Sequence, residues 1–128
     1  MGPAVEITMK NVPGHDKVEL IEIVGDLDRG SVKEAREKLI AFIEKGHINL
    51  IVDLSGLNFC DSTGILVLVH SYIKVVRYKG YFKLCKIPTD IFKLLEMIGL
   101  TKIMPIYNSI EEALHDTKDI TSEPPIMP

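Results

Sequence analysis

A short polar segment, Asp61-Ser62-Thr63-Gly64, combines one carboxylate with two hydroxyl groups. It follows Leu57-Asn58-Phe59-Cys60 and comes directly before a long apolar stretch that begins at Ile65. Asp, Ser and Thr side chains accept hydrogen bonds from the free N–H groups of a helix's first turn. The whole stretch from Leu57 to Gly64 is therefore predicted to form a strand-to-helix turn, with the Ser62 hydroxyl at its tip.

The chemistry available at such a turn is anion binding. A helix N-terminus carries a partial positive charge and unpaired N–H donors, so it accommodates an added negative group. A phosphate on Ser62 would stand at such a place. The alternative interpretation is that Asp61, Ser62 or Thr63 only caps the helix, and these residues taken alone favour the cap.

Several kinds of catalytic or cofactor site are disfavoured by missing motifs. The chain has no G-x-G-x-x-G and no Walker loop, which argues against a dinucleotide or P-loop site. It has no G-x-S-x-G elbow, and no evident His and Asp partners make Ser62 a nucleophile. The segment resembles the Asp-Thr-Gly of aspartic proteases, but Ser62 interrupts it and it occurs once. The four histidines show no metal-ligand spacing, so we expect neither metal nor cofactor.

Composition indicates a single soluble globular domain. The chain has 128 residues, of which 46% are hydrophobic and 26% charged. The net charge of −3 does not suggest nucleic-acid or anionic-membrane binding. No apolar run is long enough to span a membrane and no leader precedes Val5, so we expect a cytoplasmic protein. Cys60 and Cys85 lie in apolar surroundings and are expected to act as small hydrophobes, with a redox role for Cys60 disfavoured.

Hydrophobic periodicity predicts the elements that must position this segment. The expected strands cover residues 5–10, 18–24, 48–54, 81–87 and 103–107. The expected helices cover residues 31–45, 64–80, 88–98 and a short segment after Ser109. Residues 12–16 are expected to form the turn of an N-terminal hairpin. A strand, a helix and a strand in succession imply a parallel crossover.

Three local features refine these elements. Residues 25–30 are predicted to form a loop that carries Asp26 and Asp28. Ser31 and Glu34 have the spacing of a capping box for the first helix. Pro105 cannot donate to a ladder, which predicts an edge position for the last strand.

Residues 1–116 are expected to form the domain. Residues 117–128 contain three prolines and no periodicity, and they are expected to be a loose tail. The fold class is α/β. We expect a mixed sheet with an N-terminal antiparallel hairpin, parallel β-α-β crossovers and about four helices packed largely on one face.

From about Val5 to about Leu114 the chain resembles the STAS domains of bacterial anti-sigma factor antagonists. Gly25-Asp26-Leu27-Asp28 is similar to the family's Gly-Glu-Leu-Asp loop. Leu57 to Gly64 is similar to its phosphorylation loop, and Leu95 to Leu100 to the end of its third helix.

The resemblance implies a function. Ser62 matches the serine that an anti-sigma factor serine kinase phosphorylates, with Thr63 a less favoured acceptor. The unphosphorylated protein would bind the kinase and release a sigma factor, and a serine phosphatase would reset the cycle. Asp28 matches an acid needed for phosphorylation or binding. The implied partner-binding residues are Asp26, Asp28, Asp61, Ser62, Thr63 and Gly64.

This resemblance implies a binding module rather than an enzyme, with no direct contact to nucleic acid or membrane. We expect a monomer or weak dimer. The departures from the family pattern are Asp26 in place of Glu, Arg29-Gly30 in place of polar residues, and no second glycine in residues 65–67. Two alternatives remain open: a structural STAS scaffold subunit that is indifferent to Ser62→Asp, and a small enzyme or nucleotide-binding protein that uses Asp28, Asp61 and Ser62.

Overall fold

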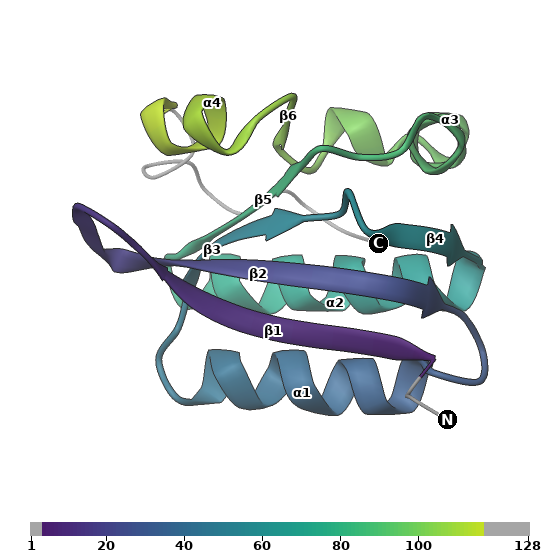
Figure 1. Ribbon diagram of the computed structural model, residues 1–128, viewed down its shortest axis with the longest axis horizontal. Coiled ribbons are helices and arrows are strands. Elements are labelled where there is room, and N and C mark those ends of the chain that lie inside the picture. Colours follow the sequence, from purple (N-terminus) through teal and green to yellow (C-terminus); the bar gives the residue numbers. More distant parts are fainter. Residues whose placement is uncertain (1–3, 117–128) are drawn as a thin grey trace.

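A computed structural model describes residues 4–116 as helices packed on a mixed β-sheet (Figure 1). The strands are β1 (Val5–Val12), β2 (His15–Leu27), β3 (Asn49–Asp53), β4 (Leu57–Cys60), β5 (Tyr81–Cys85) and β6 (Ile106–Tyr107). The helices are α1 (Val32–Glu44), α2 (Ser62–Arg77), α3 (Thr89–Ile98) and α4 (Ile110–His115), with a 3₁₀ turn, η1, at Leu100–Lys102.

The sheet is built around β2. β1 pairs antiparallel with it as the expected N-terminal hairpin. β3 pairs parallel with residues 19–22 of β2, and β4 pairs parallel with residues 25–27, so β3 and β4 lie one after the other along the same strand. β5 and β6 extend the sheet beyond β3 in parallel, and β6 forms the edge as Pro105 predicts. The expected mixed sheet is confirmed.

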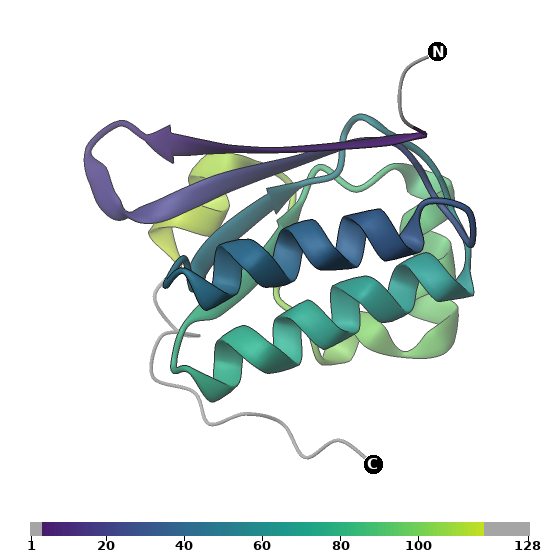
Figure 2. The same ribbon diagram turned by 90° about the horizontal axis from the view of Figure 1, so that it is seen from below.

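Each face of the sheet carries an apolar layer, and helices cover both layers. α1 and α2 lie side by side over one face, and α4 lies on the other side of the sheet (Figure 2). Alternate residues of one strand serve the two layers, because successive side chains of a strand point to opposite faces. Leu50 packs with the core under α1 and α2, whereas Ile51 packs with Ala113 of α4. Ile91 and Leu95 of α3 join the first of these clusters.

A buried lysine fixes α4 to its face. Lys83 is 1% exposed, and its ammonium group donates a 2.8 Å hydrogen bond to the carbonyl oxygen of Ala113 and another to that of Asp116. Its Nζ also lies 4.4 Å from the centroid of the Tyr81 ring. The carbonyl groups at a helix C-terminus carry partial negative charge, so a cation there stabilises the helix end.

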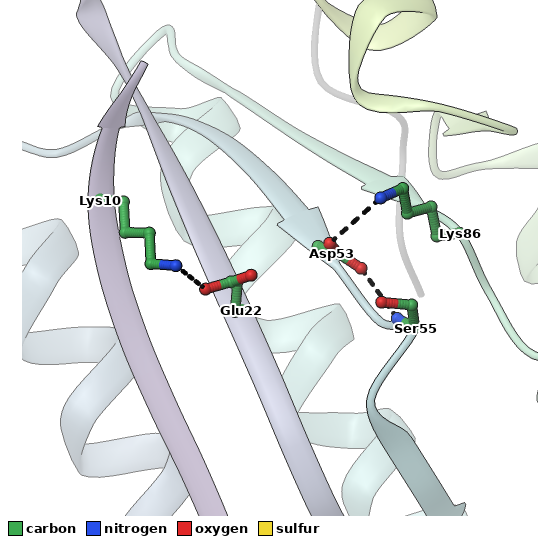
Figure 3. Close-up of polar contacts among 5 residues, drawn as sticks. All are labelled: Lys10, Glu22, Asp53, Ser55 and Lys86. Atoms are coloured by element: carbon green, nitrogen blue, oxygen red, sulfur yellow. Dashed lines mark hydrogen bonds and ion pairs between the residues drawn. The ribbon is translucent and has the colours of Figure 1, made fainter. Parts of the chain in front are cut away.

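Polar contacts shape the face of the sheet that α1 and α2 do not cover, and they set the turn into β4 (Figure 3). Lys10 and Glu22 pair across β1 and β2 at 2.7 Å. The Ser55 N–H donates a 2.8 Å hydrogen bond to Asp53, whose other carboxylate oxygen lies 3.8 Å from the Lys86 ammonium. These two contacts of Asp53 stabilise the turn that joins β3 to β4.

Two of the predicted non-strand segments are wrong. β2 continues to Leu27, so only residues 28–30 remain of the expected loop at 25–30. The segment Leu57–Cys60 is a strand and not part of a turn. Both errors have one cause: the Gly25 N–H donates to the carbonyl of Gly56, and β4 supplies the pairing that keeps the end of β2 extended. Because β1 and β4 flank this end of β2 on its two sides, tertiary pairing overrides local sequence preference here.

Smaller boundary differences occur elsewhere. The hairpin turn is confined to Pro13 and Gly14, because β1 and β2 pair up to it. The last strand begins at Ile106 rather than Ile103, because the turn continues past η1: the N–H groups of Ile103 and Met104 donate to the carbonyl of Leu100. Gly99, at φ +92°, ends α3 as expected. The expected tail at 117–128 lies outside the described residues.

Candidate functional site

The first turn of α2 is capped by Asp61. One carboxylate oxygen, Oδ1, accepts a 3.0 Å hydrogen bond from the Gly64 N–H and a 2.5 Å hydrogen bond from the Thr63 hydroxyl. Asp61 has an extended backbone, and the helix begins at the next residue, Ser62. Of the three residues that the sequence offered as a cap, Asp61 is the one that caps α2, and the Ser62 side chain is not needed for it.

Ser62 is exposed as the first residue of α2. Within residues 4–116 its hydroxyl makes no hydrogen bond to another side chain or backbone group. Thr63, by contrast, is half-buried and its hydroxyl is engaged by Asp61. Of the two neighbouring hydroxyl groups, that of Ser62 is therefore the accessible one.

Asp28 shapes the loop before α1. Its Oδ1 accepts hydrogen bonds from the Gly30 N–H at 2.9 Å and the Ser31 N–H at 3.2 Å. The Ser31 hydroxyl donates a 2.6 Å bond to the carbonyl of Asp26, and it makes no capping bond to α1. The capping box predicted for Ser31 and Glu34 is therefore wrong, because the Ser31 side chain turns back toward β2.

The loop that carries Asp28 lies against the start of α2. The Arg29 N–H donates a 3.2 Å hydrogen bond to Asp61 Oδ2, and the Asp61 N–H donates a 3.3 Å bond to the carbonyl of Leu27. The carboxyl ends of parallel strands meet at one edge of a sheet, and here Leu27 of β2 pairs with Cys60 of β4. The structure thus brings the two predicted acidic segments together beside Ser62.

A bulge in β4 determines which side chains at this edge are buried and which are exposed. Gly25 pairs with Leu57 and Asp26 with Phe59, so Asn58 is an extra residue without a partner on β2. The bulge shifts the alternation by one position, which puts Cys60 in the core at 6% exposed and leaves Phe59 51% exposed. Asp26 is half-buried at the register position of Phe59, on the face opposite the α1 and α2 layer.

Gly64 has a structural function at this site. A Cβ atom on Gly64 would lie 2.2 Å from the carbonyl oxygen of Leu27 and 3.0 Å from Cys60 Sγ. No real side chain fits at those distances, so the glycine lets α2 begin directly against the end of β2. Gly64 therefore helps to position the first turn of α2, and its contact with a partner stays a prediction.

Two groups at the site have shifted pKa values. Hydrogen bonds from the Thr63 hydroxyl, the Gly64 N–H and the Arg29 N–H lower the pKa of Asp61 below its usual range, so Asp61 remains ionised beside Ser62. Burial, with a smaller contribution from the Asp61 charge, raises the pKa of the Cys60 thiol to about 12. Cys60 is therefore a protonated core side chain at neutral pH, which argues against the redox role considered for it.

Sequence reasoning missed two exposed apolar side chains near Ser62. Phe59 and Leu66 are 51% and 52% exposed. Leu66 could have been found from helical spacing, because it follows Ser62 by four residues and so lies on the same side of α2. Phe59 could not, since its exposure depends on the bulge at Asn58.

The described part of the chain contains neither a metal-binding cluster nor a membrane-spanning helix. Among residues 4–116, no group of three or more His, Cys, Asp or Glu side chains is placed to hold a metal ion. None of the helices in the same range is both long enough and apolar enough to cross a membrane.

Comparison with known proteins identifies similar sequences. The sequence profile of the STAS domain matches residues 9–113. An anti-sigma F factor antagonist of Paenibacillus polymyxa is 28% identical over 108 residues, which cover 84% of this chain and 92% of the relative. An anti-sigma-B factor antagonist of Bacillus subtilis is 31% identical over 86 residues, which cover 67% of this chain and 78% of the relative.

Solved structures show the same fold at lower sequence identity. An anti-sigma factor antagonist of Mycobacterium paratuberculosis has a TM-score of 0.76 at 23% identity, covering 86% of this chain and 91% of that one. The Bacillus cell fate determinant SpoIIAA in its phosphorylated form has a TM-score of 0.64 at 23% identity, covering 85% of this chain and 96% of that one.

Proposed function

Because the chain belongs to the STAS domain family, we propose that it is a cytoplasmic anti-sigma factor antagonist controlled by phosphorylation of Ser62. In this proposal the protein is a binding module and not an enzyme. Its unphosphorylated form binds an anti-sigma factor serine kinase and displaces a sigma factor. Phosphorylation ends that binding, and a serine phosphatase restores it.

The observation that carries the proposal is the position of the Ser62 hydroxyl. It is exposed at the first residue of α2, and Asp61 caps the helix in its place. A kinase must bring the acceptor oxygen in line with the γ-phosphate of ATP, which requires a hydroxyl that projects from the surface. Thr63 lacks this freedom because its hydroxyl bonds to Asp61.

The surrounding fold tolerates the added charge. The start of α2 offers partial positive charge to a phosphate on Ser62. Its cap and the packing of Gly64 against Leu27 do not involve the Ser62 side chain. Phosphorylation therefore requires no rearrangement of the fold.

The charge added by phosphorylation weakens the binding of the partner. A phosphoserine adds a charge of about −1.5 to −2 next to the ionised Asp61 and the loop that carries Asp28. Like charges brought together across an interface cost several kcal/mol. A loss of about 3–4 kcal/mol weakens binding by about 10²- to 10³-fold, which is sufficient to exchange one partner for another.

The test uses the anti-sigma factor serine kinase of the source organism with ATP and Mg²⁺. We expect a single phosphate on Ser62, no label on Ser62→Ala, and a retained label on Thr63→Ala. A label that persists in Ser62→Ala would contradict the proposal.

A binding measurement completes the test. Ser62→Asp should bind the kinase about 100-fold or more weakly while its thermal unfolding stays close to that of the wild type. Two further measurements address the alternatives. Saturable amide shifts at Asp28, Asp61 and Ser62 with nucleotide alone would favour a nucleotide-binding protein. Self-assembly that is indifferent to Ser62→Asp would favour a structural scaffold.

A further inference from the structure

A groove lies between α1 and α2. The two helices run side by side over one face of the sheet (Figure 2). The groove has a volume of about 400 Å³. It is lined by Arg36 and Ile40 of α1 and by His70, Ile73, Lys74 and Arg77 of α2. The site described above uses none of these side chains.

The groove concentrates positive charge on a chain of net charge −3. Arg36 and Arg77 are exposed, and neither forms an ion pair with any of residues 4–116. Lys74 is partly neutralised by Glu44, at 2.7 Å. Cations held close together without counter-charges repel one another, so a bound anionic group would be stabilised here.

The floor of the groove is apolar. Ile40 and Ile73 are half-buried and pack against the core, which leaves part of each side chain open to the groove. An occupant can therefore bury apolar side chains between the cations. This combination suits an acidic amphipathic segment of a protein better than a bare inorganic anion.

Nearby acids argue against a uniformly anionic surface such as a membrane. Glu34, Glu37 and Glu44 are exposed on α1, the helix that supplies one wall of the groove. A flat anionic surface would contact these carboxylates together with the arginines. A peptide segment, by contrast, can have carboxylates opposite the guanidinium groups and none opposite the glutamates.

The groove is continuous with the proposed switch site. Ser62, Leu66 and His70 follow one another at four-residue spacing and are all exposed, so they form one stripe along α2 that ends in the groove. Ser62 and Arg77 are about 22 Å apart along the helix at about 1.5 Å per residue. That span fits within a standard protein–protein interface.

We propose that the groove between α1 and α2 binds an acidic amphipathic segment of the same kinase that phosphorylates Ser62. This inference rests on the proposed function. Leu66 would lie under the partner between the two contact regions, and Arg36 and Arg77 would pair with its carboxylates. The groove would supply affinity and association rate, whereas Ser62 would supply the switch.

The experiment measures the affinity of the full-length chain for the kinase. Arg36→Glu/Arg77→Glu reverses both guanidinium charges in the groove. Lys17→Glu/Lys93→Glu reverses two exposed lysines on β2 and α3 and changes the net charge by the same amount. We expect Kd to rise about tenfold or more for the groove variant and to change less than about threefold for the control.

A charge-neutralising variant and two kinetic or salt-dependence measurements extend this test. Arg36→Gln/Arg77→Gln should show an intermediate loss of affinity. The KM for phosphorylation of Ser62 should rise in the groove variant while kcat stays unchanged, because the groove is remote from the transferred phosphate. The wild type should also lose affinity more steeply with added salt than the groove variant does.

Three outcomes would overturn the inference, and they are distinguishable. If the groove and control variants bind the kinase equally, the groove is not part of the interface, and the proposed function stands. If the wild type neither binds the kinase nor is labelled on Ser62, the proposed function itself fails. If phosphatidylglycerol vesicles bind the wild type and not the groove variant, and kinase affinity is unchanged, the groove serves a membrane surface instead.

Discussion

The backbone N–H of Arg29 donates a 3.2 Å hydrogen bond to the Asp61 carboxylate, although the two residues are 32 positions apart in the chain. The other oxygen of that carboxylate caps α2 by accepting from the Gly64 N–H. One side chain therefore joins the loop before α1 to the first turn of α2. The position of Asp28 relative to Ser62 depends on these two hydrogen bonds to Asp61.

Replacing Asp61 should loosen both segments. Asp61→Ala removes the acceptor for three donors, and Asp61→Asn keeps one acceptor oxygen but turns an NH₂ group toward the remaining donors. We expect stability to decrease from wild type to Asn to Ala, measured by urea denaturation. Equal stability of all three proteins would show that these hydrogen bonds do not hold the loops.

The stabilisation by Asp61 should also depend on pH. Hydrogen bonds, the one from Thr63 first, lower the pKa of Asp61 in the folded protein. A carboxyl with a lowered folded pKa stabilises the fold above its unfolded pKa of about 3.9, and this contribution is lost as the pH falls through the folded pKa. The stability difference between wild type and Asp61→Asn should therefore be full near neutral pH and shrink in acid. A difference that is constant down to strongly acidic pH would contradict this assignment.

Local sequence rules predicted those parts of the site that depend on neighbouring residues. A helix cap within Asp61-Ser62-Thr63 was predicted because these short polar side chains can reach the free N–H groups of a first turn, and the structure shows that Asp61 is the cap. Because Asp61 takes this position, Ser62 is left exposed as the first residue of α2. That the Asp28 loop lies beside Ser62 depends instead on the pairing of Leu27 in β2 with Cys60 in β4.

The remaining features depend on residues distant in sequence. Leu57–Cys60 contains an asparagine and precedes polar residues, so it resembles a turn until pairing with the end of β2 makes it a strand. The same pairing creates the bulge at Asn58 and exposes Phe59. The burial of Lys83 could not be predicted from its neighbours either. The carbonyl groups that accept hydrogen bonds from its ammonium group belong to residues 30 and 33 positions later in the chain.

Gly64→Ala should disturb the start of α2 more than a helix-favouring substitution normally would. The new Cβ would lie 2.2 Å from the Leu27 carbonyl oxygen, which is backbone and cannot turn aside. We expect a loss of about 1–3 kcal/mol in the free energy of unfolding, from the overpacking. Chemical denaturation measures this loss, and kinase labelling of Ser62 should fall with it because the helix start is displaced.

Gly30→Ala is the matched control for that substitution. Gly30 belongs to the neighbouring loop, and a Cβ there would meet only Asp28 Oδ1 at an ordinary 3.4 Å. Its stability should stay within about 0.5 kcal/mol of the wild type. If Gly64→Ala were tolerated as well as Gly30→Ala, the close approach of α2 to Leu27 would not be required.

Cys60 should be unreactive in the folded protein despite its proximity to Ser62. With a pKa of about 12, only about one thiol in ten thousand is ionised at pH 8, and the side chain is buried. Iodoacetamide should modify Cys60 slowly in native buffer and rapidly in urea, as measured by peptide mass spectrometry. Rapid modification of the native protein would reverse the conclusion that this thiol is a core side chain.

Substitutions of Asp28 should separate its structural function from its charge. Asp28→Asn keeps the Oδ1 acceptor for the Gly30 and Ser31 N–H groups, whereas Asp28→Ala removes it. The alanine variant should therefore lose about 0.5–2 kcal/mol of stability, as for a lost helix cap, and the asparagine variant only a few tenths. If the kinase recognises the charge of Asp28, it should phosphorylate Ser62 of the well-folded asparagine variant more slowly than Ser62 of the wild type. Normal labelling of Asp28→Asn, together with slow labelling of Asp28→Ala, would instead show that Asp28 acts only by shaping the loop that lies against Asp61.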